Sequence, residues 1–144
     1  MRSLFVMMGL ALGASPEAFE ALRNGDAAAL VKALDAGASV NAKDEQGQTL
    51  LMHALVYLPI EGARLLLDRG ADVNLTGKGG ATALMVACGD FAKARLLVER
   101  GADVNARSAG GITAMRHAMA VPAGKETVLY LLSGASGGAG LNYL

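Results

Sequence analysis

The phrase Gly-Ala-Asp-Val-Asn, which occurs at Gly70–Asn74 and again at Gly101–Asn105, decides the fold of this chain. A near copy, Gly-Ala-Ser-Val-Asn, lies at Gly37–Asn41, and a degenerate fourth copy begins at Gly134. The four copies start 33, 31 and 33 residues apart. A fixed period of this size is typical of a supersecondary unit that stacks on copies of itself. We therefore predict a repeat array, which presents a binding surface rather than a reaction centre.

Each repeat carries the signals of two helices joined by turns. In the second repeat, Gly47 can supply a turn with positive φ, and Thr49 stands directly before an apolar run, where its hydroxyl can cap a helix. We expect a first helix over about residues 49–57 and a second over about 60–69, with Gly70 as the left-handed residue beyond its end. In this second helix we expect Leu65 and Leu66 to lie on the buried stripe. The same signals recur at Gly80, Thr82, Gly101, Gly111 and Thr113.

The repeated phrase leaves the second helix in extended form. Val73 and Val104 are expected to pack inward, and Asn74 and Asn105 can hydrogen-bond turn backbone. The expected repeat has a hairpin loop, two antiparallel helices and an extended segment that leads to the next hairpin. This order resembles the ankyrin repeat over about residues 15–134. The resemblance implies an all-α repeat solenoid of stacked helix-turn-helix repeats with short hairpin loops. The expected repeats are residues 15–42, 43–75, 76–106 and 107–134.

The repeats depart from the family's Thr-Pro-Leu-His tetrapeptide. It reads Thr-Leu-Leu-Met at 49–52, Thr-Ala-Leu-Met at 82–85 and Thr-Ala-Met-Arg at 113–116. Without proline the first helical turn is less stiff, and the histidine that hydrogen-bonds between repeats in the family is replaced each time. Asp44 has no counterpart in the later repeats, where Gly77 and Ser108 occupy its place. We expect an array less rigid than the family ideal.

The two ends of the chain differ in composition from the repeats. Residues 1–14 join a basic start to an apolar stretch and small residues, which indicates either a signal peptide or an apolar segment that covers the open end of the array. The stretch is too short for a membrane span. We favour the signal peptide, and therefore a periplasmic or secreted protein over a cytoplasmic one. Residues 135–144 have the composition of a Gly/Ser-rich tail. We favour a tail that is flexible or that is cut from a longer array. The alternative is a tail that folds back on the last repeat.

Bulk composition excludes several classes of function. Thirteen basic and thirteen acidic residues balance, and no Lys/Arg cluster indicates a nucleic-acid binder. Hydrophobic residues make up 53% of the chain and aromatic residues 4%, so alanine, leucine and valine must fill the core. Cys88 is the one cysteine, most readily a small packing residue, and no Cys/His set has the spacing of a zinc site. We predict neither a metal nor a cofactor.

The histidines do not indicate catalysis. His53 and His117 hold equivalent positions two repeats apart, and no serine or cysteine recurs with them as a nucleophile. We interpret both as surface histidines on first helices. Residues 76–80 superficially resemble a phosphate loop, but Asp72 and Gly79 stand where that motif needs glycine and Ser/Thr. We therefore predict no enzyme activity and no small-molecule substrate.

The resemblance implies that function lies on the hairpin tips and on the concave face of the first helices, where ankyrin repeats bind partner proteins. Tyr57, with His53 one turn away, is the best anchor because tyrosine is favoured in interface hot spots. The predicted partner-binding residues are Lys43, Glu45, Gln46, Gln48, His53, Tyr57, Thr76, Lys78, Ala81, Val86, Asp90, Arg107, Ala109, Ile112, His117 and Val121.

The leading hypothesis is a non-enzymatic protein–protein interaction module for an unidentified protein. The first alternative is a regulatory or immunity-type ankyrin segment of a longer polypeptide. The second is an enzyme inhibitor that occludes an active site with its hairpin tips.

Overall fold

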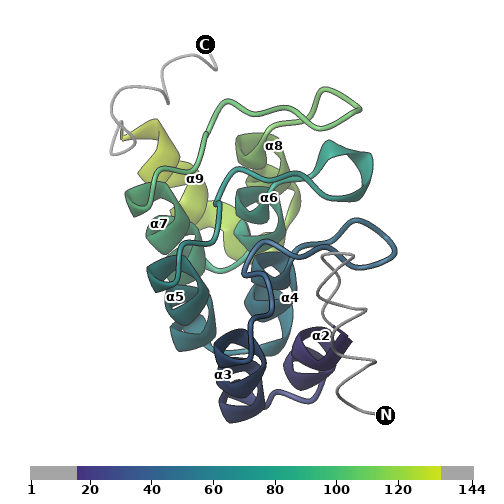
Figure 1. The fold of residues 1–144 in the computed structure, drawn as a ribbon. Helices are drawn as coiled ribbons and strands as arrows, with labels where there is room; N and C mark the ends of the chain where they lie inside the picture. The colour runs from purple at the N-terminus through teal and green to yellow at the C-terminus, as the bar shows by residue number, and fades with distance from the viewer. Residues whose placement is uncertain (1–15, 134–144) are drawn as a thin grey trace. The chain divides into compact units, whose positions relative to one another are not determined.

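A computed structural model describes residues 16–133, and every regular element in that range is a helix (Figure 1). The chain divides between Asp72 and Val73 into two compact units. The first unit contains α2 (Pro16–Arg23), α3 (Ala27–Asp35), α4 (Leu50–Tyr57) and α5 (Ile60–Asp68). The second contains η1 (Lys78–Gly80), α6 (Ala83–Ala87), α7 (Phe91–Glu99), α8 (Ala114–Ala120), η2 (Pro122–Gly124) and α9 (Lys125–Leu132). The predicted all-α fold class is confirmed, whereas the predicted signal peptide at 1–14 and the tail at 135–144 lie outside the described residues.

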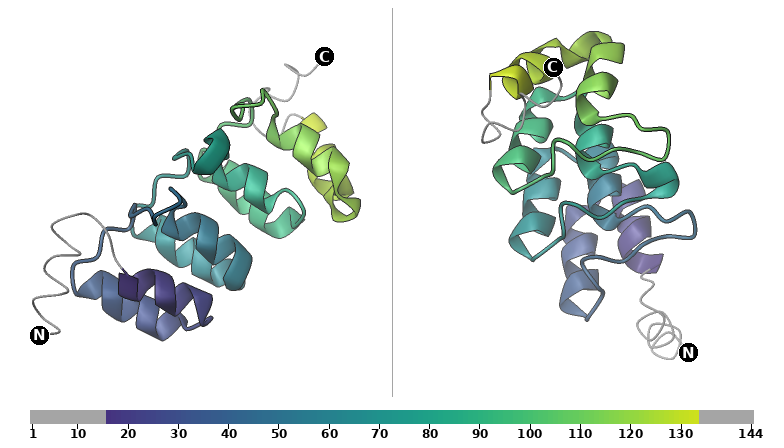
Figure 2. Two further views of the ribbon diagram at one scale, coloured as in Figure 1. Left: turned by 90° about the vertical axis from the view of Figure 1, so that its right-hand side faces the viewer. Right: turned by 90° about the horizontal axis from the view of Figure 1, so that it is seen from above.

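Within each unit the helices form antiparallel pairs (Figures 1 and 2). In the first unit α2 pairs with α3 and α4 with α5, and α4 also packs against α2. In the second unit α6 pairs with α7 and α8 with α9, while α8 packs against α6 and α9 against α7. Each unit is therefore two stacked helical hairpins, because a single hairpin cannot bury its own apolar face.

The buried face of α5 is shifted by one residue from the sequence expectation. The apolar pair expected to be buried was Leu65 and Leu66, but Leu66 and Leu67 are the buried pair and Leu65 is half-buried. Gly62 and Ala63 are buried one turn earlier, so the covered stripe recurs with the helical period. The start of the helix sets this phase, and the leucine run alone does not reveal it.

The threonines expected to cap the first helices do so. Each side-chain oxygen accepts a hydrogen bond from the backbone N–H three residues later, which satisfies one of the unpaired donors at a helix start. The bonds join Thr49 to Met52 (3.2 Å), Thr82 to Met85 (3.4 Å) and Thr113 to Arg116 (3.4 Å).

The second helices end as the sequence predicts. Gly70 and Gly101 have φ of 93° and 94°, a region that side chains of L-residues disfavour. The N–H of Ala71 then donates to the carbonyl of Leu66 at 3.0 Å, which closes the helix end in a Schellman motif. Each glycine therefore turns the chain out of its helix and into the extended part of the phrase.

The asparagine of the repeated phrase links one repeat to the next. In the first unit, Asn41 Oδ1 accepts from the N–H of Asp72 at 2.7 Å. In the second unit, Asn74 Oδ1 accepts from the N–H of Asp103 at 2.8 Å, and its Nδ2 donates to the carbonyl of Gly101 at 3.2 Å. The sequence predicted bonds to turn backbone, but not that the turn belongs to the following repeat. These bonds join neighbouring repeats in a chain that lacks the family's bridging histidine.

Candidate functional site

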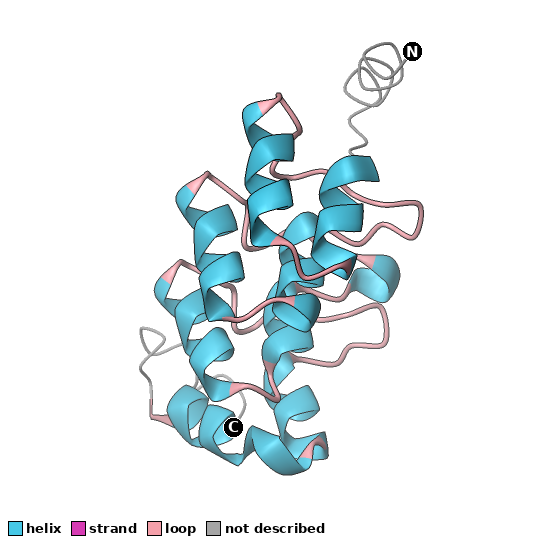
Figure 3. Cartoon of the chain, turned by 90° about the horizontal axis from the view of Figure 1, so that it is seen from below, coloured by secondary structure: helices cyan, strands magenta, loops and turns pink. Residues whose placement is uncertain are grey.

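The second, third and fourth repeats are each entered through a hairpin (Figure 3). One N–H donates across each hairpin, from Asp44 to Gln48 (2.9 Å), from Gly77 to Ala81 (2.7 Å) and from Ser108 to Ile112 (2.9 Å). The predicted turn glycines have positive φ, at 82° for Gly47, 75° for Gly80 and 76° for Gly111. The third hairpin also contains η1, in which Gly79 has φ of 70°, whereas the second and fourth hairpins differ mainly in their side chains.

Asp44 joins the hairpin of the second repeat to α4. Its Oδ1 accepts from the N–H groups of Gln46 and Gln48, both at 2.9 Å, and its Oδ2 lies 2.8 Å from Nε2 of His53. The two side chains are 19% and 14% exposed. Burial of the carboxyl opposes ionisation, but the bonds from Gln48, His53 and Gln46 outweigh it and lower the pKa of Asp44.

Two further aromatic rings, Phe19 and Tyr57, contact His53 along the face shared by α2 and α4. The Phe19 ring meets His53 edge to face, with centroids 5.0 Å apart, and the Tyr57 ring stacks on His53 at 5.9 Å and 17°. Phe19 is buried, whereas Tyr57 is 48% exposed. The interpretation of His53 as a surface histidine is wrong, because the hairpin, the first repeat and Tyr57 enclose its ring.

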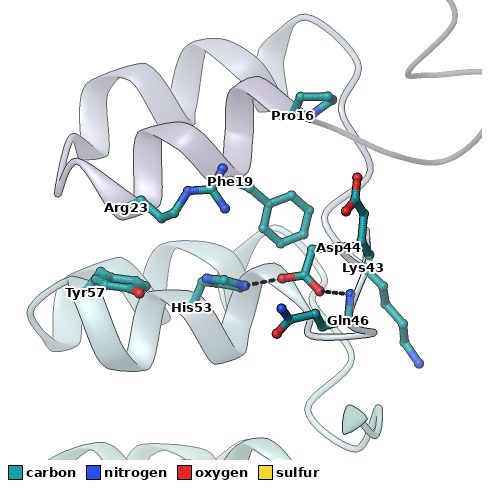
Figure 4. A pocket seen from close by; sticks show the side chains of 9 residues that line it. Pro16, Phe19, Arg23, Lys43, Asp44, Gln46, His53 and Tyr57 are labelled. Carbon is teal, nitrogen blue, oxygen red and sulfur yellow. Dashed lines mark hydrogen bonds and ion pairs between the residues drawn. The ribbon is translucent and has the colours of Figure 1, made fainter.

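These groups surround a pocket of about 470 Å³ (Figure 4). Its described lining comes from α2 (Pro16, Phe19 and Arg23), from the hairpin (Lys43, Asp44, Glu45 and Gln46) and from α4 (His53 and Tyr57). Five of the predicted partner-binding residues thus meet here, and a sixth, Gln48, is half-buried at the base of the same hairpin.

Sequence reasoning missed the contribution of the first repeat to this pocket. Phe19 and Arg23 lie four residues apart on α2, the same spacing as His53 and Tyr57 on α4, and such residues share one helix face. That spacing is a usable signal, but the first repeat lacks the Gly-x-Thr entry that aligned the others. Asp44 was recognised as unusual, yet it was not assigned to the site.

Some polar groups of the pocket have hydrogen-bond partners, and others have none among the described residues. Both oxygens of Asp44 have partners. Over residues 16–133, no partner faces the Arg23 guanidinium, the Glu45 carboxylate or the Tyr57 hydroxyl. The pocket therefore offers an aromatic wall with one cation and one anion available at its rim.

The His53–Asp44 pair has the form of a general base and its orienting carboxylate, but it lacks a nucleophile. No serine, threonine or cysteine is among the described residues that line the pocket. Cys88 belongs to the other unit, where it is 5% exposed and its Sγ donates to the carbonyl of Met85. Burial raises the pKa of the Cys88 thiol, so its environment is that of a packing residue rather than a nucleophile.

No group of three or more His, Cys, Asp or Glu side chains in residues 16–133 could hold a metal ion. None of the helices in that range has the length and apolar character needed to cross a membrane.

The predicted residues of the third repeat lie on and beside its hairpin. Thr76 pairs across the hairpin with Thr82, Lys78 begins η1, and Ala81 follows it. Val86 lies on α6 and is 37% exposed. Asp90 was expected on the face of the first helix, but it caps the second, where its Oδ1 accepts from the N–H of Lys93 at 3.3 Å. The short α6 ends three residues earlier than α4 does in its own repeat, so Asp90 falls beyond the helix.

The predicted residues of the fourth repeat are more varied. Arg107 donates to the carbonyl of Gly111 at 3.2 Å, and the N–H of Ala109 donates to Gly79 of the preceding hairpin at 2.7 Å. Ile112 and Val121 are 36% and 37% exposed, and His117 is half-buried on α8. These positions therefore combine a charged side chain, Arg107, with the exposed apolar side chains of Ile112 and Val121.

Comparison with known proteins now identifies the architecture. The model of the family described as "Ankyrin repeats (3 copies)" matches residues 18–108, which is more than half of the chain. The chain belongs to the ankyrin repeat family. Ankyrin repeats are generally protein–protein interaction modules, and the family is typically non-enzymatic.

Relatives of this ankyrin repeat chain match it over part of their own length. It is 48% identical over 59 residues to Ankyrin repeat and SOCS box protein 6 of Homo sapiens, covering 37% of this chain and 14% of that protein. It is 35% identical over 72 residues to an ankyrin repeat-containing protein of Schizosaccharomyces pombe, covering 50% and 35%. It is 39% identical over 69 residues to Ankyrin repeat, SAM and basic leucine zipper domain-containing protein 1 of Oryctolagus cuniculus, covering 48% and 14%. The chain thus spans about a third or less of the length of these relatives.

Proposed function

We propose that this ankyrin repeat chain binds a partner protein without catalysing a reaction, and that the pocket of the first unit is the centre of its contact surface. The observation that carries the proposal is Tyr57, whose ring is stacked on His53 and is still 48% exposed beside the pocket. A ring already held by stacking loses little conformational freedom when a partner covers it. Tyrosine is also among the residues enriched in binding hot spots.

The surroundings of Tyr57 support this assignment. Lys43, Glu45 and Gln46 lie on the exposed hairpin tip, and they place a polar rim beside the aromatic wall. Protein interfaces commonly have this anatomy, with aromatic residues at the centre and polar residues at the edge. In the second unit, the exposed Val86 and Ile112 are proposed as further contacts.

The test is a quantitative pull-down with the full chain as bait, in which Tyr57→Ala is compared with wild type. We expect at least about a tenfold loss of the specific partner, the loss typical of a hot-spot tyrosine. The matched control is Arg64→Ala, because Arg64 is exposed on α5 and outside the pocket. His53 is left unchanged, since its removal would deprive Asp44 of a partner and disturb the hairpin.

Binding of the captured protein to each purified variant is then measured by calorimetry. Equal affinity for wild type, Tyr57→Ala and Arg64→Ala would place the interface elsewhere. A reaction catalysed by the purified chain would contradict the non-enzymatic assignment.

A further inference from the structure

We propose that the pocket receives a carboxylate, presented by an acidic side chain of the partner protein, and that Arg23 is the residue that binds it. The inference rests on the proposed protein-binding function and adds the chemistry of the contact. Three observations support it: which charged groups of the pocket lack a partner, where Arg23 lies, and how far the aromatic rings are exposed.

The two charged groups nearest the rings are in opposite situations. The Asp44 carboxylate already receives two backbone N–H groups and the His53 ring, so it has little capacity to attract a partner's cation. Arg23 is exposed, and no acceptor faces it in residues 16–133. A guanidinium carries five donors in a planar fork that matches a carboxylate. Of these two charged groups, Arg23 is therefore the one that still needs a partner among the described residues, and that partner must be an acceptor.

The position of Arg23 suits this role. It is the last residue of α2, and its side chain runs along the helix toward Phe19, on the side that faces α4 with His53 and Tyr57 (Figure 4). Lys43 extends away from Arg23 in the same view, so Arg23 is the cation that faces the aromatic wall. The methylene groups of an acidic side chain can pack on the Tyr57 ring, whose hydroxyl is a second available donor.

The Phe19 and His53 rings of this cluster do not offer a site for a cationic ligand. Cation binding by aromatic residues uses an open ring face. Phe19 is only 4% exposed, and the His53 ring is covered by Phe19 at one side and by Tyr57 at another. Glu45 on the hairpin tip is the uncommitted carboxylate of the described lining, and it disfavours a run of acids. The occupant we propose is therefore a partner segment with a single acidic residue at Arg23.

The test uses the full chain labelled with ¹⁵N and three capped amino acids as probes: N-acetyl-glutamate N-methylamide, its glutamine analogue and its lysine analogue. The glutamine probe matches the glutamate probe in shape and lacks its charge. We expect the glutamate probe, at millimolar concentration, to shift the Arg23 Nε–H signal and to bind about two- to fivefold more tightly than the glutamine probe, the range for an exposed ion pair. Equal responses to glutamate and glutamine, or no response at Arg23, would overturn the proposal.

Two variants establish which residue is responsible. Arg23→Gln should abolish the difference between the glutamate and glutamine probes, whereas Arg64→Gln, on the exposed face of α5, should preserve it. Arg23 also lies at the C-terminal end of α2, where a cation stabilises a helix, so thermal unfolding of both variants is measured alongside. A glutamate preference that survives in folded Arg23→Gln would assign the carboxylate to another residue and defeat the proposal.

The captured partner separates this inference from the proposed function. If Tyr57→Ala weakens partner binding and Arg23→Gln does not, the protein-binding function stands and the carboxylate assignment fails. If neither variant changes binding, both fail.

Discussion

The hairpins of the second and fourth repeats share a backbone turn and are each followed by a helix with a histidine, but they differ in the side chain that starts the turn, Asp44 in one and Ser108 in the other. Asp44 binds two N–H groups of its own hairpin and also reaches His53. Ser108, at the equivalent place, accepts from the N–H of Ile112 at 3.3 Å and makes no bond to His117. The shorter hydroxyl reproduces the local turn but cannot reach across to the helix. The repeat scaffold therefore depends on backbone geometry, whereas the pocket depends on a side chain that the scaffold does not require.

The largest expected loss of stability comes from a feature that the two repeats share, a buried leucine on the second helix. Leu66 and Leu131 are fully buried on the second helices of the second and fourth repeats. We expect Leu66→Ala and Leu131→Ala each to lower the free energy of unfolding by about 2–5 kcal/mol, through lost apolar burial and the cavity left behind. Urea unfolding followed by circular dichroism measures this.

The control for the leucine pair is Leu132→Ala, one residue along α9 and 45% exposed. It should cost less than about 1 kcal/mol, because less apolar area leaves water on folding. Similar losses for Leu131→Ala and Leu132→Ala would show that the buried face of α9 is wrongly assigned.

The next largest effect is expected from removing the side chain that distinguishes each hairpin. Asp44→Ala leaves the N–H groups of Gln46 and Gln48 and the ring of His53 without their acceptor, and we expect a loss of about 1–3 kcal/mol. Ser108→Ala removes one bond at an exposed site and should cost less than about 1 kcal/mol. Hydrogen exchange at the amides of Gln48 and Ile112 should rise in the respective variants.

The stability difference between wild type and Asp44→Asn should also depend on pH. The folded-state pKa of Asp44 is lowered, so the carboxylate stabilises the fold fully above its unfolded pKa of about 3.9. This contribution is lost as pH falls through the lower folded-state pKa. A difference between the two proteins that is constant from neutral to acid pH would count against the role given to Asp44.

A third effect compares two buried threonines of the fourth repeat. Thr113 caps α8, and Thr113→Val should cost about 1 kcal/mol. Thr127 is fully buried on α9, and its Oγ1 has no hydrogen-bond partner in residues 16–133. Thr127→Val should therefore be neutral or stabilising, because it removes a buried polar group that gains no bond. Thermal unfolding decides, and a loss at Thr127 equal to that at Thr113 would reveal a bond to its hydroxyl.

The smallest effect is expected when the aspartate of the second hairpin is introduced at the equivalent position of the fourth. Ser108→Asp should place a carboxylate within reach of His117 and add up to about 1 kcal/mol of stability, the usual limit for an exposed pair. Ser108→Asn is the control of similar shape without the charge. The His117 ring signals in NMR spectra should move in the Asp variant alone. If they do not, the histidine of the fourth repeat is oriented differently from His53.

The regular part of the fold was predictable because its signals are local. Thr49, Thr82 and Thr113 each precede an apolar run, and a cap is made to a group three residues away. Gly70 marks a helix end for a similar reason, since only glycine tolerates that backbone region without strain. Such features need no knowledge of the rest of the chain.

The site was predictable only in part, because its geometry joins segments that the sequence keeps apart. Tyr57 and the hairpin residues were found from their place in the repeat. Phe19 and Arg23 were missed because the first repeat has no hairpin motif to set its register. The bond between Asp44 and His53 was missed because no helical or strand period relates residues nine apart across a hairpin.

The sequence by itself determined the repeat, its helix starts and stops, and the balance of charge that argues against nucleic acid. The repeat and its helix ends depend on interactions within a few residues, and the net charge is a count of charged residues. Tertiary structure decided that Asn41 and Asn74 link neighbouring repeats, that His53 is enclosed and that Arg23 is left without an acceptor among the described residues. These are properties of helices packed side by side, where burial and hydrogen bonding depend on which distant groups arrive at the same place.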